Sequence, residues 1–294
     1  MTAHVAERGE GRGRVVLRLG CAGPVSDVAI DAAIAVAKAF GAGIECLLVE
    51  DRQVYDAAAY SFTREIAIES AGERQMSLDD LARQMALAAR ATERRVADRA
   101  GLADIPIELR HVRDTPLGAL AHACQIAGPW NVVALGEVAT SALLARLEVL
   151  FDRVTGMTGV VVAGHRSPRQ GRPAASAGPV VAVVEDPDRL TGMIRTASRL
   201  AGVSGSDVVV ALAAQSRSGM AWLAENVRQG IGGDRRVEVV ELAQPGGGPA
   251  VLTEGLRRLR PGFVIAEFGG LAVPVASGGG ALAAALDCPL LVVR

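Results

Sequence analysis

One pattern occurs twice along this chain: a short apolar run followed by a helical segment, repeated until a fifth apolar run closes the set. The first copy spans residues 14–164 and the second spans residues 179–294. Runs that are apolar almost throughout, such as 180–184, are typical of strands buried on both faces of a parallel sheet. Because such strands alternate with helices, we predict an α/β protein of two tandem domains, each a doubly wound five-stranded parallel sheet with right-handed crossovers.

Capping residues mark the ends of several predicted helices. Ser26 stands before the first helix and Gly41 stands after it, as expected at helix ends. Ser77 starts a long amphipathic helix that Gly101 would end, and Thr115 starts the next. The predicted strands are 14–20, 44–49, 105–112, 131–136 and 159–163 in the first copy, and 180–184, 207–213, 236–242, 263–268 and 289–293 in the second.

A long connection distinguishes the first copy from the second. Residues 50–76 join its second strand to the next helix, whereas most connections in compact domains have about 4–6 residues. The segment carries both tyrosines of the chain, Tyr55 and Tyr60, together with Phe62 and charges of both signs. We predict a short helix at 54–60 and, for the segment as a whole, either a lid or the surface that binds a protein partner.

Composition excludes several classes of protein. The net charge is −1, from 31 basic and 32 acidic residues, whereas nucleic-acid binders usually carry a basic excess. No apolar run reaches the roughly 18 residues that a membrane span needs, and residues 1–13 read as a disordered lead-in without a signal core. The four cysteines form no CxxC pair, and Cys46 and Cys288 fall in or beside strands as buried apolar residues would. We therefore expect a reduced, cytoplasmic protein that binds neither nucleic acid nor membrane.

Motifs of catalysis and of metal binding are missing from the sequence. It contains no GxSxG, no GxxxxGK[ST] and no HExxH. His111 and His122 have no second set of ligands at metal spacing, so we expect them to be structural or exposed. Trp130 and Trp222 are predicted to pack against the sheets. We predict a protein without enzymatic activity, the alternative being a nucleotide-dependent transferase or hydrolase. Residues 165–178 are polar with Pro, Gly and Ala, and are predicted to be a linker.

Acidic residues gather where a ligand would bind. In a doubly wound sheet, ligands bind at the carboxyl ends of the strands, between strands one and four. Such acidity repels a triphosphate unless a divalent cation intervenes. Three interpretations stay open: a Mg²⁺ site, a surface for a basic partner segment, or a rim of solvated carboxylates. The residues are Glu50, Asp51 and Glu137 in the first copy, and Glu185, Asp186 and Glu267 in the second.

The order of elements, closing on the strand CPLLVV at 288–293, resembles the universal stress protein family. The stretches VEDR at 49–52 and FTREI at 62–66 resemble a tandem subgroup of that family. The resemblance covers nearly all of both copies. It implies adenine-nucleotide-hydrolase-like domains with strand order 3-2-1-4-5 and a role in stress response or its regulation. It also implies an internal pseudo-dimer in which 159–163 meets 289–293, so that each covers the other's open edge. Further homodimerisation stays open.

ATP-binding members of that family carry an acidic residue after strand one and G-x2-G-x9-G-[S/T] after strand four. Glycines there let backbone N–H groups close on phosphate oxygens. In the first copy Gly136 matches the first glycine, but Ala139 stands at the second, and the final pair falls on 149–150, which is Val-Leu. Strand one ends in Gly20-Cys21, without a carboxylate. We predict that the first copy has lost nucleotide binding.

The second copy keeps more of this pattern. Asp186 stands in for the acidic residue, Gly269 follows strand four, and three glycines precede the last helix, although the spacing between them fails. The three glycines at 278–280 form either an anion-binding nest or a flexible loop. The candidate site for ATP or AMP is therefore Asp186, Gly269, Gly278, Gly279 and Gly280. Our leading hypothesis is a regulatory protein without a cofactor that binds a protein partner through 50–76. The alternative is an adenine-nucleotide-binding regulator that uses the second copy.

Overall fold

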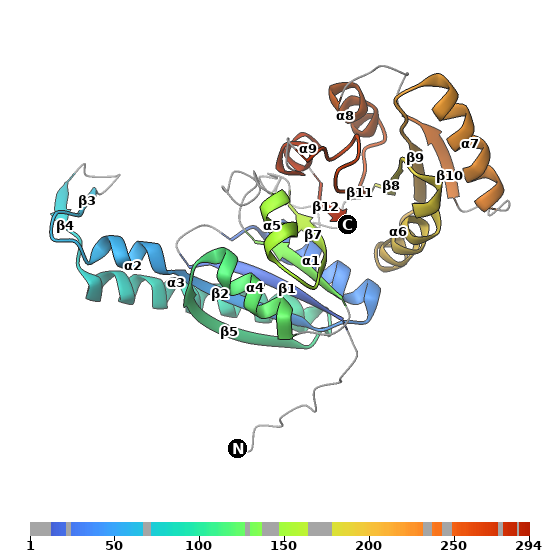
Figure 1. Ribbon diagram of the computed structural model, residues 1–294. Coiled ribbons are helices and arrows are strands. Elements are labelled where there is room, and N and C mark those ends of the chain that lie inside the picture. Colours follow the sequence, from blue (N-terminus) through green and yellow to red (C-terminus); the bar gives the residue numbers. More distant parts are fainter. Residues whose placement is uncertain are drawn as a thin grey trace.

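The computed structural model describes residues 13–21, 25–66, 72–126, 130–136, 147–163, 178–231, 237–242, 249–275, 279–286 and 288–294. The predicted lead-in, apart from Gly13, and the predicted linker, apart from Gly178, lie outside these residues. Within the described residues, ten strands form one sheet with helices on both faces (Figure 1).

The first half of the sheet contains β1, β2, β5, β6 and β7, in the spatial order β5-β2-β1-β6-β7. The strands are β1 (Arg14–Gly20), β2 (Ile44–Asp51), β5 (Ile107–Asp114), β6 (Asn131–Leu135) and β7 (Met157–Val162). The helices are α1 (Asp27–Phe40), α2 (Arg52–Ala58), α3 (Leu78–Leu102), α4 (Pro116–Ile126) and α5 (Leu147–Arg153).

The second half has the same order of strands, β10-β9-β8-β11-β12. The strands are β8 (Val180–Val184), β9 (Val208–Leu212), β10 (Val237–Glu241), β11 (Phe263–Glu267) and β12 (Leu290–Val293). The helices are α6 (Leu190–Ser204), α7 (Arg217–Ile231), α8 (Pro249–Arg258) and α9 (Gly279–Leu286), with a 3₁₀ turn at Pro187–Arg189. Counted along the chain, each half has the strand order 3-2-1-4-5, which confirms the predicted fold class.

The two halves meet where β7 and β12 pair antiparallel, with Val161 opposite Leu291 and Val160 opposite Val292. The other neighbouring strands of the sheet run parallel. Each of these two strands would otherwise end its half with a row of unpaired backbone groups. The predicted internal pseudo-dimer is thereby confirmed at its joining edge.

Helices of the two halves form continuous layers on the two faces of the sheet. One core contains side chains of α1, α3, α6 and α7, and the other contains side chains of α4, α5, α8 and α9. Alternate residues of a strand face alternate cores: Val181 and Val183 face the second, whereas Val180, Ala182 and Val184 face the first. Burying a Val or Leu side chain contributes roughly 1.5–3 kcal/mol, so these strands are well anchored on both faces.

Local signals set most of the helix ends as predicted. The Ser26 hydroxyl accepts a hydrogen bond from the N–H of Ala29, and Gly41 ends α1 in the left-handed conformation, with φ 60°. Ser77 caps α3 in the same way as Ser26 caps α1. The predicted end at Gly101 is wrong by one residue, because α3 runs to Leu102 and the left-handed residue that follows is Asp104.

One tryptophan lies where it was predicted and one does not. Trp130 is half-buried, and its ring lies 5.5 Å from that of Phe40. Trp222 is 59% exposed, so the prediction that it packs against a sheet is wrong. The apolar face of α7 that meets the sheet is formed by Met220, Leu223, Ala224 and Val227, and Trp222 lies on the opposite face.

The long connection of the first half forms a projecting arm. It comprises α2 and a two-stranded sheet of β3 (Arg64–Ile66) and β4 (Glu73–Gln75). We call residues 52–66 and 72–77 the arm. It extends with the start of α3 beyond the large sheet, at the left of Figure 1. The corresponding connection of the second half, from β9 to α7, takes only residues 213–216.

Candidate functional site

The carboxyl ends of β8 and β11, which pair in parallel, are linked by hydrogen bonds between a side chain and a loop. Glu185 follows β8, and the loop 268–275 follows β11. The carboxylate of Glu185 accepts two hydrogen bonds from this loop: Oε2 from the N–H of Leu271 at 2.5 Å, and Oε1 from the N–H of Ala272 at 3.0 Å. One side chain therefore takes two consecutive backbone donors.

The two glycines of this loop have distinct physical roles. Gly269 has φ 87°, a conformation that side-chain-bearing residues rarely adopt. Gly270 leaves room for the carboxylate, because a Cβ at this position would lie 2.6 Å from Oε2 of Glu185. The loop is held on itself as well, since the N–H of Gly269 donates to the carbonyl of Val273 at 2.9 Å.

Burial and a second carboxylate act on Glu185. Burial is the larger cause and raises the pKa of Glu185; the two backbone N–H groups oppose this, and the charge of Glu267 adds to it. Glu267 is itself paired with Arg189 at 3.2 Å. The ionised form of Glu185 thus depends on the loop's N–H groups to offset the cost of burial.

The predicted nucleotide residues lie in different places. Gly269 is in the loop that Glu185 binds. The carboxylate of Asp186 accepts the N–H of Asp188 at 2.9 Å and caps the 3₁₀ turn. Gly279 and Gly280 are the first residues of α9, and Gly278 lies outside the described residues.

The residue that reaches the loop is Glu185, which the sequence prediction placed only in the acidic rim. The alternation along β8 was the signal that could have identified it. Val181 and Val183 face the core of α8 and α9, and continuing this alternation directs residue 185 to the same face. The loop between β11 and α9 lies on that face, so Glu185 meets it and Asp186 does not.

The adenine nucleotide implied by the family resemblance does not fit this loop as it stands. A phosphate group bound by the N–H groups of Leu271 and Ala272 would occupy the space that the carboxylate of Glu185 takes. It would also meet two negative charges, Glu185 and Glu267. A nucleotide phosphate therefore has to displace a side chain that already satisfies these donors.

Carboxylates of the first half are also engaged within the protein. Glu50 Oε2 accepts hydrogen bonds from the hydroxyl of Tyr55 at 2.9 Å and from Nε and Nη2 of Arg113 at 3.1 Å. The Arg113 guanidinium lies 3.9 Å from the centre of the Tyr55 ring. Burial, the first cause, and the carboxylate of Glu50 raise the pKa of Tyr55. Asp51 caps α2.

The cysteines and His111, which were singled out in the sequence, lie in the core or in an ion pair. Cys21, Cys46, Cys124 and Cys288 are buried and form no disulfide, and burial raises the pKa of the Cys21 thiol to about 11. His111 pairs with Glu93. Among the described residues, no three His, Cys, Asp or Glu side chains lie together as a metal site would need. Glu137 and Ala139 lie outside the described residues.

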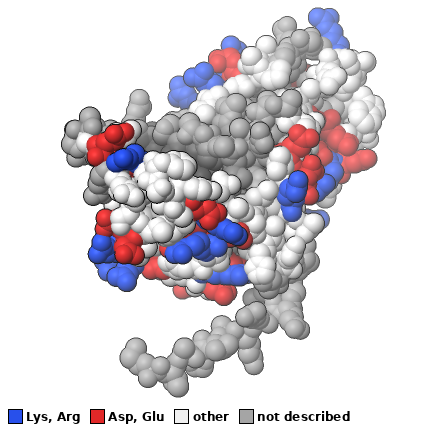
Figure 2. Space-filling view, turned by 60° about the vertical axis from the view of Figure 1, so that its left-hand side comes forward, with Lys and Arg blue, Asp and Glu red and all other residues white. Residues whose placement is uncertain are grey.

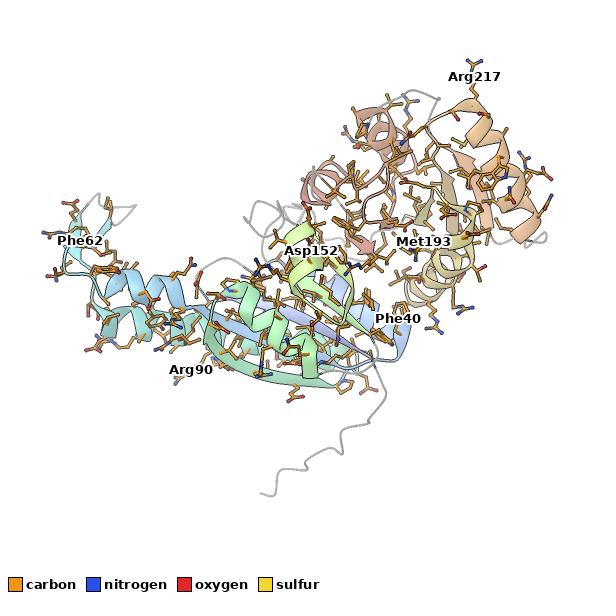
Figure 3. All side chains as sticks on the ribbon, in the orientation of Figure 1. Phe40, Phe62, Arg90, Asp152, Met193 and Arg217 are labelled. Carbon is orange, nitrogen blue, oxygen red and sulfur yellow. The ribbon has the colours of Figure 1, made fainter. Side chains whose placement is uncertain are left out.

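Exposed aromatic side chains gather on the arm. The rings of Tyr60 and Phe62 stack with their centres 5.3 Å apart and their planes at 21°. Their exposed fractions are 58% and 76%, and that of Ile66 is 64%. Figure 3 shows Phe62 on the arm, at the end away from the large sheet. On the face seen in Figure 2, basic and acidic side chains lie next to one another rather than in separate fields.

No helix in the described parts of the chain has the length and hydrophobicity to cross a membrane. No protein-family model and no curated protein matches the sequence. Similar solved structures do exist. A universal stress protein from Archaeoglobus fulgidus is 13% identical with a TM-score of 0.59, and the match covers 95% of this chain and 96% of that one.

Two proteins from Pseudomonas aeruginosa are similar over comparable lengths. One, described as functionally unknown, is 14% identical with a TM-score of 0.53, over 96% of this chain and 92% of its own. The other, described as a putative universal stress protein, is 14% identical with a TM-score of 0.52, over 95% and 92%. Together with the strand order of both halves, these matches show that the chain has the fold of the universal stress proteins.

Proposed function

We propose that this protein acts in stress response or its regulation, in the cytoplasm, by binding a protein partner through the arm rather than by catalysis. The observation that carries the proposal is the stacked pair of Tyr60 and Phe62, which the arm holds in solvent. Large aromatic side chains dominate the energetics of interfaces because they bury much apolar area at a low cost in side-chain entropy.

The arm has a second property that suits a binding element. Among the residues that the structure describes, its sheet consists of β3 and β4, of three residues each. An isolated two-stranded hairpin is marginally stable in water and gains stability from further strands or from packing. A partner that covers Phe62 and Ile66 would supply that packing. The partner surface is therefore expected to be apolar where it meets these side chains.

Contacts at its base fix the direction in which the arm projects. Tyr55 in α2 is held by Glu50 at the end of β2 and by Arg113 in β5. Val54 and Met76 pack against the core that α1 and α3 share. The aromatic pair is thus presented on an element that is tied to the sheet, which lowers the entropy lost on binding.

The test compares two exposed aromatic surfaces of the same chain. In one variant, Tyr60→Ser and Phe62→Ser remove the stacked pair; in the matched control, Trp222→Ser removes an aromatic side chain that is 59% exposed on α7. Affinity capture from the source cells, followed by mass spectrometry, measures which proteins each variant retains. We expect the wild type and the Trp222 control to retain a common partner that the double variant loses at least tenfold.

Retention of the same proteins by all three forms would contradict the proposal. Both variants change exposed residues, so thermal unfolding should stay cooperative with a midpoint close to that of the wild type. This measurement separates a lost partner surface from a lost fold.

A further inference from the structure

The loop after β11 has the geometry of an anion-binding site. The N–H groups of Leu271 and Ala272 point to one place, at distances of 2.5 and 3.0 Å from the two oxygens of one carboxylate. Consecutive backbone N–H groups that converge in this way bind anions in many proteins. Charge-assisted hydrogen bonds of this kind are shorter and stronger than those between neutral groups.

The loop is shaped for an anion at this place and not only for a turn. Gly269 turns the chain through a positive φ, and Gly270 has no side chain where the carboxylate approaches. Any side chain at position 270 would begin 2.6 Å from a Glu185 oxygen. The anion that fills the site comes from the neighbouring strand, β8.

A tethered carboxylate competes strongly with a free anion. Linking a ligand to its site gives it an effective concentration on the order of millimolar for a short flexible linker, and Glu185 directly follows the buried strand β8. A free dianion must in addition approach Glu185 and Glu267. Arg189 offsets the charge of Glu267, with 3.2 Å between Nε of the arginine and Oε1 of the carboxylate.

We infer that residues 269–272 form an anion site for which Glu185 is the built-in ligand, and that this site binds a free anion of the phosphate class once the carboxylate is removed. The inference does not depend on the arm. It replaces the expected nucleotide site of the second half with a site that the chain occupies itself.

Three variants of the full-length protein test this inference. Glu185→Ala removes the carboxylate and frees both donors. Glu185→Gln removes the charge but keeps the bulk of the side chain in the loop. Asp186→Ala is the matched control. It removes an equal charge at the next residue, whose carboxylate bonds to the 3₁₀ turn and not to the loop.

The probe is inorganic phosphate, titrated at constant ionic strength and followed by calorimetry and by the amide NMR signals of Leu271 and Ala272. We expect Glu185→Ala to bind phosphate at least tenfold more tightly than the wild type, with the largest shifts at these two amides. Glu185→Gln and Asp186→Ala should remain within threefold of the wild type.

Equal phosphate affinity in Glu185→Ala and the wild type would overturn the inference, and so would an equal gain in Asp186→Ala, which would reduce the effect to net charge. Loss of the carboxylate could also loosen the loop. Thermal unfolding with and without phosphate addresses this, because a ligand that binds only the folded state raises the midpoint. Phosphate should raise the midpoint of Glu185→Ala and leave that of the wild type unchanged; the reverse would also overturn the inference.

Discussion

Glu185 and Gly270 are two parts of one contact, and their energies should be coupled. Gly270→Ala places a Cβ 2.6 Å from Oε2 and 2.8 Å from Cδ of Glu185. Either the carboxylate or the loop has to move, and overpacking of this kind costs about 1–3 kcal/mol of unfolding free energy. In the Glu185→Ala background the same substitution should cost less than half as much. Urea unfolding of the four proteins in a double-mutant cycle measures the difference; the same cost in both backgrounds would contradict the contact.

An ion network around a buried carboxylate of the first half offers a second test. Glu45 in β2 is 3% exposed and pairs with Arg14 of β1 and, at 3.5 Å, with Arg110 of β5. Glu45→Gln takes this carboxylate from two partly exposed arginines, which should cost about 1.5–3 kcal/mol of unfolding free energy. The control is Glu254→Gln on α8, where an exposed pair with Arg257 or Arg258 is worth about 0–1 kcal/mol. Urea unfolding that gave equal losses for both variants would refute this assignment.

At the scale of the element, apolar periodicity and capping residues were sufficient to predict most strands and helices. Runs such as 180–184 in β8 are apolar throughout because both faces are covered, so their ends stand out against polar loops. Helix ends with a Ser cap or a left-handed glycine were also predicted, because these residue types are typical of helix ends. Asp104, two residues beyond the end of α3, adopts the left-handed conformation that usually indicates glycine, so the residue types carried no clear signal for this helix end.

The arm shows what local patterns cannot predict. Strands β3 and β4 have three residues each, with sequences Arg-Glu-Ile and Glu-Arg-Gln, and such runs carry no recognisable alternation. The exposure of Tyr60 and Phe62 also depends on where the arm points, which is set by distant contacts such as that of Tyr55 with Arg113. The sequence predicted a lid or partner surface here but not a projecting hairpin.

The candidate site was predicted only in part, because the deciding contact is long-range. The glycines at 278–280 suggested an anion nest, whereas the N–H groups that converge on a carboxylate are those of Leu271 and Ala272. That carboxylate is 86 residues away in the chain from Leu271 and 87 from Ala272. Only the alternation along β8 distinguished Glu185, which meets the loop, from Asp186, which caps the 3₁₀ turn.

At the scale of the whole molecule, the halves are joined by more than the β7–β12 pair. The rings of Phe151 in α5 and Phe268 after β11 lie 4.7 Å apart. Arg294 donates from Nη1 to the carbonyl of Phe151 at 3.1 Å. On the other face α1 and α6 are in contact, and the Arg199 guanidinium lies 5.3 Å from the centre of the Phe40 ring. These contacts predict that both halves unfold together.

Calorimetry tests this joint unfolding. We expect one transition whose calorimetric and van't Hoff enthalpies agree. Phe268→Ala should lower the midpoint of that single transition. The expected loss of unfolding free energy is on the order of 2–3 kcal/mol, because this half-buried ring loses fewer contacts than a fully buried one would. Phe62→Ala, at a ring that is 76% exposed, should leave the midpoint nearly unchanged. Two separate transitions in the wild type would show that the halves are independent.

We infer that the chain's own Glu185, and not a nucleotide, occupies the N–H groups of Leu271 and Ala272 at the carboxyl edge of the second half. The most direct measurement is to denature the purified wild-type protein, analyse the released small molecules by mass spectrometry, and titrate the stripped protein with Mg·ATP and AMP by calorimetry. We predict no released adenylate and no binding heat with ligand at about millimolar concentration, roughly a thousandfold above a micromolar dissociation constant. Release of adenylate at a large fraction of an equivalent per chain, or saturable heat with either nucleotide, would contradict it and would favour the nucleotide-binding regulator.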